Sequence, residues 1–120
     1  MPRQSVFDMA FSKVYPLLVQ KAQKKGRTRA EVDEVACWLT GYTPSQIEEA
    51  LSSAVTYGEF LSQAPLWNPL SDLITGKVCG VQVEAIPDPL TRRMRQLDKL
   101  VDELAHGKPV DMVKRQETGV

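Results

Sequence analysis

The stretch RTRAEVDEVACWLTGYTPSQIEEAL, residues 27–51, predicts two helices joined by a short turn. Thr28 and Glu31 have the spacing of a capping box, in which each side chain accepts a hydrogen bond from the backbone N–H of the other residue. Gly41 stands where a residue in the left-handed conformation commonly ends a helix. Residues 43–46, TPSQ, repeat the capping box and place a proline at the first helical position, where it fits. The sequence therefore marks both helix starts and the stop between them.

Both helices carry an apolar stripe at helical spacing but are too short to be stable alone. The stripes consist of Val32, Val35, Ala36 and Leu39 in the first helix and Ile47, Ala50, Leu51 and Ala54 in the second. Because alanine buries little area, these helices need a larger partner to pack on. A helix at 89–105 is predicted to be that partner, since Asp88 caps it, Gly107 ends it and large apolar residues line one face. Those residues are Leu90, Met94, Leu97, Leu100, Val101 and Leu104.

The remaining segments predict shorter elements. A helix is expected over residues 12–25 and is ended by Gly26, and a third capping box opens a short helix over residues 56–63. Residues 64–72 contain two prolines and an asparagine, which predicts a loop. Apolar and polar residues alternate toward the end of the stretch 77–85, which predicts a short β segment or hairpin.

These elements together predict a mainly α protein. The expected architecture is a single small bundle of the orthogonal type, with five or six helices and one short β segment or hairpin near 77–85. A chain of 120 residues is long enough for one core without metal or disulfide support. We place the domain at residues 9–116 and expect residues 1–8 and 117–120 to be flexible termini.

Composition narrows the class of protein. The formal net charge is zero, so no bulk electrostatic attraction to nucleic acid or to anionic membranes is expected. The sequence has no apolar run of membrane-spanning length and no signal peptide at its start, so no membrane partner is predicted. Cys37 and Cys79 lie far apart and lack the spacing of a metal site, which predicts reduced thiols in a cytoplasmic protein.

Two long stretches carry a resemblance to a known family. They are VYPLLVQKAQKKGRTRAEVDEVACWLTGY at residues 14–42 and LITGKVCGVQVEAIPDPLTRRMRQLDKLVDELAHGK at residues 73–108. The motif CWLTGY and the run ITG-x-x-CG-V-x-V are their most specific parts. The chain resembles the uncharacterised bacterial family catalogued as domain of unknown function 2200. The resemblance implies a small, mainly helical, prokaryotic protein and implies no activity, cofactor or catalytic residue.

Few residues offer candidate chemistry. His106 is the only histidine and follows Glu103 in the form Glu-x-x-His, but di-metal bundles with this spacing need a second copy and further glutamates. A cation at a helix C-terminus is stabilised by the helix dipole, which explains His106 without a function. We therefore expect no metal and no cofactor. Cys79, beside Gly80 in the extended segment, is the better candidate for a reactive thiol, because Cys37 on a helix fits a small buried side chain.

Trp38, Tyr42 and Trp67 are large side chains near predicted turns or loops. Side chains of this kind are typical of pockets and interfaces. They also commonly close small cores, so both interpretations stay open.

Three functional hypotheses follow. The leading one is a non-enzymatic cytoplasmic protein that binds a protein partner or forms a homo-oligomer. The second is an enzyme or small-molecule binder with a pocket near Tyr42, Trp67 and Cys79. A thiol of lowered pKa would favour the second hypothesis, and dry packing of these residues would favour the first. The third is nucleic-acid binding by the two-helix stretch, which is disfavoured because Glu48 and Glu49 on the second helix would face phosphates.

Overall fold

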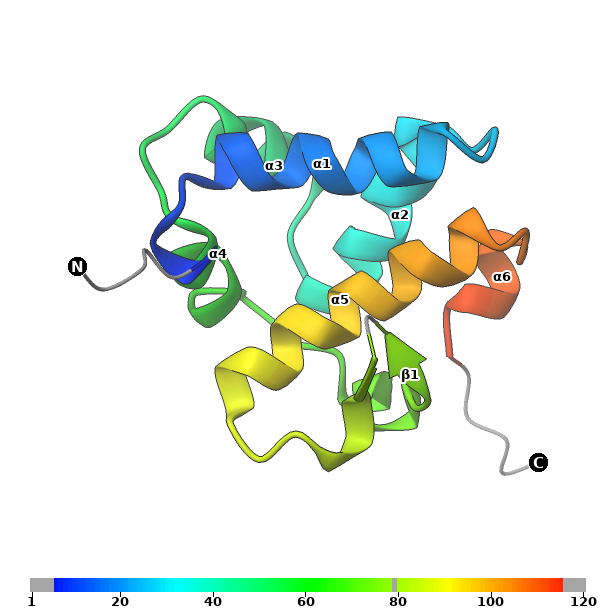
Figure 1. Cartoon of the computed structure of the whole chain (residues 1–120). Helices are drawn as coiled ribbons and strands as arrows, with labels where there is room; N and C mark the ends of the chain where they lie inside the picture. The colour runs from blue at the N-terminus through cyan, green and yellow to red at the C-terminus, as the bar shows by residue number, and fades with distance from the viewer. Residues whose placement is uncertain (1–5, 79, 116–120) are drawn as a thin grey trace.

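Helices dominate the part of the chain that the structure, a computed structural model, describes, which is residues 6–78 and 80–115 (Figure 1). The helices are α1 (Phe11–Gln23), α2 (Arg29–Thr40), α3 (Pro44–Leu51), α4 (Tyr57–Ser62), α5 (Pro89–Ala105) and α6 (Val110–Val113). A hairpin pairs β1 (Lys77–Val78) antiparallel with β2 (Val81–Gln82). The 3-10 turns are η1 (Val6–Asp8), η2 (Pro69–Leu73) and η3 (Val83–Ala85). The predicted class, mainly α with a short β hairpin, is confirmed.

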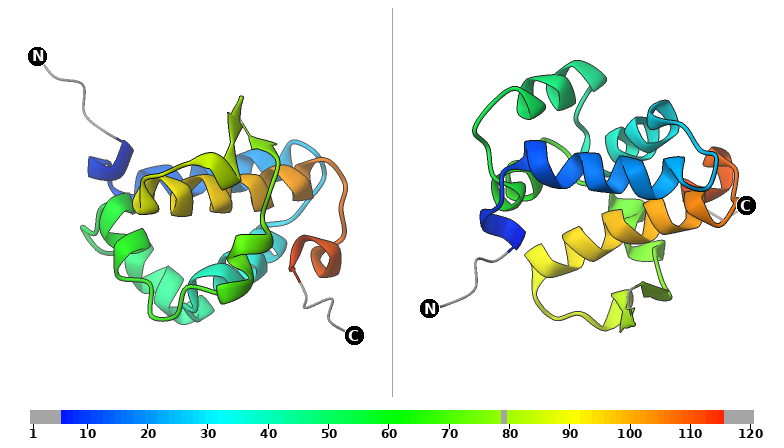
Figure 2. Two further views of the ribbon diagram at one scale, coloured as in Figure 1. Left: turned by 90° about the horizontal axis from the view of Figure 1, so that it is seen from below. Right: turned by 45° about the horizontal axis from the view of Figure 1, so that its top comes forward.

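Helix α5 is the element on which most others pack. It contacts α1, α2, α4, α6 and the hairpin, whereas α3 packs mainly on α1 and α2. In the left view of Figure 2, α1 and α5 run side by side along one side of the molecule, and α2, α3 and α4 follow the other side. The inner face of α5 carries four side chains with no exposed surface, Leu97, Leu100, Val101 and Leu104. The predicted apolar stripe is therefore the centre of the core, although Leu90 at its start is only partly buried.

The helix starts follow the capping pattern of the sequence. Thr28, Thr43 and Thr56 each accept a hydrogen bond from the backbone N–H three residues later, and the side chain of that later residue accepts from the threonine N–H. Asp88 accepts from the N–H of Thr91 at the start of α5. Backbone donors that a helix leaves unpaired are thus satisfied locally.

The backbone carbonyls at the end of α2 accept hydrogen bonds mostly from a segment that is distant in sequence. Its last four carbonyls would lack partners in an isolated helix. The N–H of Gly41, which has φ +83°, bonds to the Cys37 carbonyl. Asn68 and Leu66 supply the other donors, to the carbonyls of Trp38, Leu39 and Thr40. The loop at 64–68 is therefore fixed against the C-terminal end of α2.

Gly41→Val is expected to destabilise the fold by about 2–4 kcal/mol. A branched side chain at positive φ costs roughly 1–2 kcal/mol, and here a Cβ would lie 2.7 Å from the Leu66 carbonyl oxygen, so backbone must also move. Gly26→Val is a matched control, because Gly26 has φ +82° and a Cβ there would have no atom of the described part of the chain within 4 Å. Urea denaturation measures both losses. Equal losses for the two variants would contradict the tight approach of Leu66.

Two element boundaries differ from the prediction. Helix α3 ends at Leu51, and Ala54 is exposed rather than part of the buried stripe. The Ser53 hydroxyl bonds to the Ala50 carbonyl at 2.9 Å, which gives the backbone an alternative to another helical turn. Helix α1 ends at Gln23, two residues before the predicted end.

The strand pattern near 77–85 also stops early. After Gln82 the chain leaves the hairpin and forms η3. The N–H of Val83 bonds to the Gly76 carbonyl at 3.0 Å, and the Glu84 carboxylate accepts from the Gly76 N–H at 3.1 Å. These bonds turn the chain inward and bury Val83 in the core, so burial overrides the alternating pattern.

The packed part of the chain begins before residue 9, where the sequence placed the domain start. Turn η1 contacts α4, and Phe7 lies so close to Gly58 that a Cβ there would be 3.0 Å from the Phe7 Cβ. Residues 1–5 and 117–120, which were predicted to be flexible, lie outside the described residues.

Among the described helices, none combines the length and the apolar character needed to cross a lipid bilayer.

Two buried tyrosines are expected to respond oppositely to loss of the hydroxyl. The Tyr15 hydroxyl donates to Asp33 at 2.5 Å, whereas the Tyr57 hydroxyl is buried and has no hydrogen-bond partner among the described residues. Tyr15→Phe should therefore lose about 1–2 kcal/mol and Tyr57→Phe should gain up to about 1 kcal/mol, because an unpaired buried polar group is unfavourable. Denaturation midpoints of the two variants measure this, and a loss in both would show that Tyr57 has a partner.

Candidate functional site

An open groove runs along the outer face of α2. Its volume is about 530 Å³, and its walls come from α2, the start of α3 and the residue after α6. The lining residues are Ala30, Asp33, Glu34, Cys37, Trp38, Pro44 and Lys114. A hollow of this volume lies within the range of roughly 300–1,000 Å³ that is usual for ligand sites.

Helical spacing explains why these α2 side chains meet. Ala30, Glu34, Cys37 and Trp38 recur at intervals of three and four residues, so they share a face beside the buried stripe. Cys37 and Trp38 are both half-buried, since the core holds one side of each and the groove exposes the other. Trp38 was singled out from the sequence only as a large side chain near a predicted turn. Lys114 could not be found from sequence, because only the tertiary fold brings it to α2.

The charged groups of the groove are paired. Lys114 Nζ lies 2.6 Å from a Glu34 carboxylate oxygen. Asp33 accepts from the Tyr15 hydroxyl and lies 3.3 Å from Arg29 Nε. Because both carboxylates have cationic partners, the groove presents an apolar floor between compensated charges.

The Cys37 thiol in this groove is not an activated nucleophile. Burial raises the pKa of Cys37 above its usual value, and the carboxylates of Asp33 and Glu34 raise it further. A catalytic cysteine needs the opposite shift, because the thiolate is the reactive form. No hydrogen bond connects Cys37 with His106 within the described residues, so these two side chains do not form a nucleophile–base pair.

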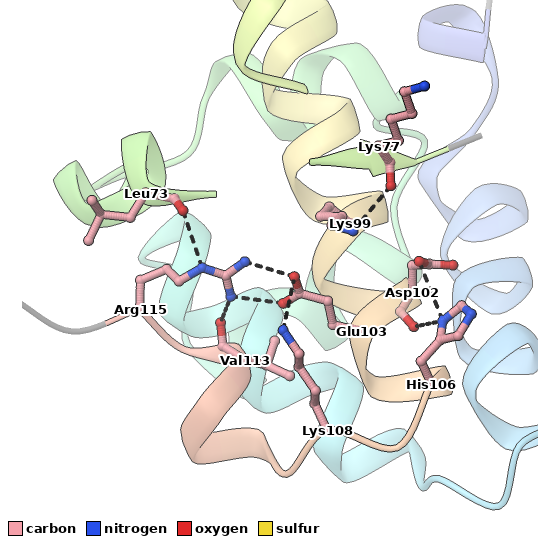
Figure 3. A network of polar contacts seen from close by, with 9 residues as sticks. All are labelled: Leu73, Lys77, Lys99, Asp102, Glu103, His106, Lys108, Val113 and Arg115. Carbon is pink, nitrogen blue, oxygen red and sulfur yellow. Dashed lines mark hydrogen bonds and ion pairs between the residues drawn. The ribbon is translucent and has the colours of Figure 1, made fainter. Parts of the chain in front are cut away.

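Glu103 is bound by cations at the end of α5 (Figure 3). Both of its oxygens accept from Arg115, at 2.8 Å each, and Lys108 Nζ lies 3.7 Å away. The nearby His106 Nδ1 lies 2.7 Å from the Asp102 carbonyl oxygen. Glu103 therefore joins α5 to the C-terminal segment, whereas the printed contacts of His106 are to Asp102 on its own helix. In residues 6–78 and 80–115, no three His, Cys, Asp or Glu side chains gather as metal ligands.

The structure places Tyr42 and Trp67 in different surroundings. Tyr42 stacks on Phe60 at 4.5 Å, donates to the Phe60 carbonyl at 2.8 Å and lines a hollow of about 310 Å³ between α3 and α4. Trp67 donates to Gln96 at 3.0 Å, and the Arg93 guanidinium lies 4.6 Å from its ring centre. Cys79, the third residue of the predicted pocket, lies outside the described residues.

Fold and groove together define a small, mainly helical domain with an open groove along α2. A family model described as "Uncharacterized protein conserved in bacteria (DUF2200)" matches residues 5–115. The chain belongs to this family, as the sequence resemblance predicted. It is similar to the crystal structure of the uncharacterized protein SP1917, with 42% identity, a TM-score of 0.90 and coverage of 97% of this chain and 98% of that chain. No curated protein matches it.

Proposed function

We propose that this protein is a non-enzymatic binding protein that holds an apolar segment of a protein partner in the α2 groove. The half-buried Trp38 on the groove floor is the observation that carries this proposal. Tryptophan is among the residues that most often dominate binding energy at protein interfaces, where a large ring is buried by the partner. The ion pair between Lys114 and Glu34 at the wall resembles the polar rim that surrounds such anchors.

Two exposed apolar residues on segments that contact α2 add to the proposal. Leu66 and Met112 are 69% and 64% exposed. Leu66 is bonded to the end of α2 through Thr40, and Met112 belongs to α6, which packs on α2. A partner that docks along α2 could cover both of these exposed side chains.

Other observations favour binding of a protein partner over enzymatic catalysis and over nucleic-acid binding. The raised pKa of Cys37 and the bonds of His106 at the end of α5 leave no nucleophile–base pair among the described residues. Glu48 and Glu49 are exposed on α3 and would repel phosphates. We propose the cytoplasm as the compartment, because Cys37 is a free thiol and reduced thiols persist there.

Site-specific photocrosslinking in living bacteria tests the proposal. A benzophenone amino acid replaces Ala30, which is exposed in the groove, or Ala85, which is exposed but not part of it. We expect position 30 to yield a discrete product with a second protein, and position 85 to yield none. Adding Trp38→Ala should abolish the product while a thermal melt shows that the chain is still folded.

Three outcomes would contradict the groove as a binding site. They are no product at position 30, equal products from both positions, and a product that survives Trp38→Ala. A product with the mass of two copies of this chain would show that the groove holds a second copy instead.

The hollow at Tyr42 supports a second candidate, the binding of a small molecule. It gathers the polar side chains of Gln46, Glu49 and Gln63 around the Tyr42 and Phe60 rings, a composition usual for ligand sites. Native mass spectrometry of the protein purified from its own bacterium tests this. A bound molecule that is lost in Gln63→Trp would support it, and bare protein would contradict it.

A further inference from the structure

A polar hollow lies over the C-terminal half of α5. Its volume is about 240 Å³, and it is lined by Lys99, Asp102, Glu103, His106 and Lys108. The first four recur at intervals of three and four residues, so they share one face of the helix, and the last follows the helix end. None of the five lines the α2 groove, so the inference does not depend on the proposed function.

Both carboxylates of this hollow are already bound by cations from other segments. Lys21 of α1 lies 3.1 Å from an Asp102 oxygen. Arg115 donates to both oxygens of Glu103, at 2.8 Å each. Figure 3 shows Arg115 on one side of Glu103, and His106 turned toward Asp102 on the other. The acidic groups therefore have little charge left for the lysines of the hollow.

The two lysines of the hollow keep most of their charge unneutralised. Lys99 forms no ion pair within residues 6–78 and 80–115, and its ammonium donates to the Lys77 carbonyl at 3.1 Å. The Lys108 ammonium lies 3.7 Å from a Glu103 oxygen that already accepts from Arg115. Both ammonium groups can therefore donate further hydrogen bonds.

The charge balance around the hollow is positive. The lining residues and the two cations bound to them comprise four permanent cations and two carboxylates, which leaves two positive charges. The neighbouring groups do not change this balance. Asp98 pairs with Arg95 at 3.4 Å. Glu84, which acts electrostatically on Lys99, is matched by the opposite charge of Lys77 in the hairpin.

We propose that this hollow binds the phosphate group of a small molecule, either inorganic phosphate or a small phosphate monoester. A phosphate monoester carries about −1.5 to −2 charges at pH 7, which matches the excess of two positive charges. Lysine ammonium groups commonly bind phosphate as point charges. The volume of about 240 Å³ lies below the range of roughly 300–1,000 Å³ of sites for larger ligands, so the hollow suits a single phosphate group.

His106 supplies a third donor. Its Nδ1 lies 2.7 Å from the Asp102 carbonyl oxygen, which can only accept, so Nδ1 carries a hydrogen. The other ring nitrogen, Nε2, has no partner among the described residues, and the side chain is 74% exposed. When the ring is protonated, Nε2 can donate to a phosphate oxygen while Nδ1 keeps its bond.

The C-terminal end of α5 opposes an anion, because the helix dipole is negative there. Backbone N–H groups of residues 106–108 already donate to the carbonyls of Asp102, Glu103 and Leu104. These bonds occupy the carbonyl oxygens that would otherwise face the hollow unpaired, so the lysine ammonium groups determine its potential.

An NMR titration of the isotope-labelled full chain with sodium phosphate tests the proposal, at constant pH and with ionic strength held constant by sodium chloride. We expect saturable shifts of the His106 ring signals and of the amides of residues 107 and 108. The ring signals are unambiguous, because the chain has one histidine.

Lysine variants locate the site. Lys99→Gln and Lys108→Gln should each weaken phosphate binding by about fivefold or more, because each removes a charge-assisted hydrogen bond. Lys13→Gln is the matched control, since Lys13 is exposed near the start of α1 and does not line the hollow, and it should leave binding unchanged. Dispersed amide signals should show that all three variants are folded.

A second titration with glycerol phosphate separates the two sources of the phosphate group. Tighter binding of glycerol phosphate would assign the hollow to a phosphate monoester, and equal or weaker binding would assign it to inorganic phosphate. Four results would overturn the proposal. They are no saturable shift with either probe, the same shifts with chloride alone, binding that is unchanged in both Lys99→Gln and Lys108→Gln, and an equal weakening in Lys13→Gln.

Discussion

A chain that ends at Ile86 is expected to be unfolded or molten, because it lacks α5. Five apolar side chains of α5 are buried, namely Met94, Leu97, Leu100, Val101 and Leu104. Each buried side chain of this kind contributes roughly 1.5–3 kcal/mol, so together they contribute on the order of 10 kcal/mol before conformational entropy is counted. That sum is comparable with the whole net stability of a domain, about 5–15 kcal/mol. Loss of dispersed amide NMR signals and of a cooperative melt would show that the truncated chain does not fold.

Single substitutions on α5 test the packing of its side chains without shortening the chain. Leu97→Ala should cost about 2–5 kcal/mol, since Leu97 has no exposed surface. Leu90→Ala should cost clearly less, because Leu90 is only partly buried at the start of the helix. A truncated chain that kept a cooperative melt would contradict the central role of α5, as would equal losses in these two variants.

Arg115→Gln is expected to cost about 3 kcal/mol, the second large effect. The Glu103 side chain is only 7% exposed, and Arg115, itself 15% exposed, binds both of its oxygens. Removing one partner of a buried pair leaves an uncompensated charge, which typically costs 3–5 kcal/mol. Lys108 at 3.7 Å remains to offset part of this loss. Urea denaturation of the variant measures it.

The neighbouring ion pair supplies the control. Lys114→Gln breaks the pair with Glu34, whose side chain is 51% exposed, so the loss should stay below about 1 kcal/mol. The double variant of Glu103→Gln with Arg115→Gln should be more stable than Arg115→Gln alone, because no buried charge is left without a partner. A double variant as unstable as the single one would show that Arg115 acts through packing and its bonds to backbone carbonyls.

Features that depend on neighbours in sequence were predictable. The three threonine capping boxes, the aspartate cap of α5 and the glycine stop at Gly41 each need only residues within a few positions, and the structure shows all of them. The helical stripe of α5 was predictable for the same reason. Ala54 failed as a core residue because a serine hydroxyl two residues after Leu51 competes for the backbone.

Features that depend on distant contacts were not predictable. Arg115 is separated from Glu103 by the turn at Gly107 and by α6, so no spacing rule pairs them. The groove needs Lys114 beside α2, which again follows only from the tertiary fold. Tyr42 and Trp67 were singled out as large side chains near loops, but their hydroxyl and indole groups bond to Phe60 and Gln96, partners that sequence does not indicate.

The pairing of α1 with α5 sets how fast the chain can reach its native state. These helices form the most extensive helix–helix contact, yet residues 24–88 separate them along the chain. Single helices form within about a microsecond, but closing so long a loop loses chain entropy before any contact compensates for it. Refolding should therefore be slower than in bundles whose neighbouring helices pack in sequence order. We therefore expect the meeting of the two distant helices, rather than the growth of either one, to be the slow event in refolding.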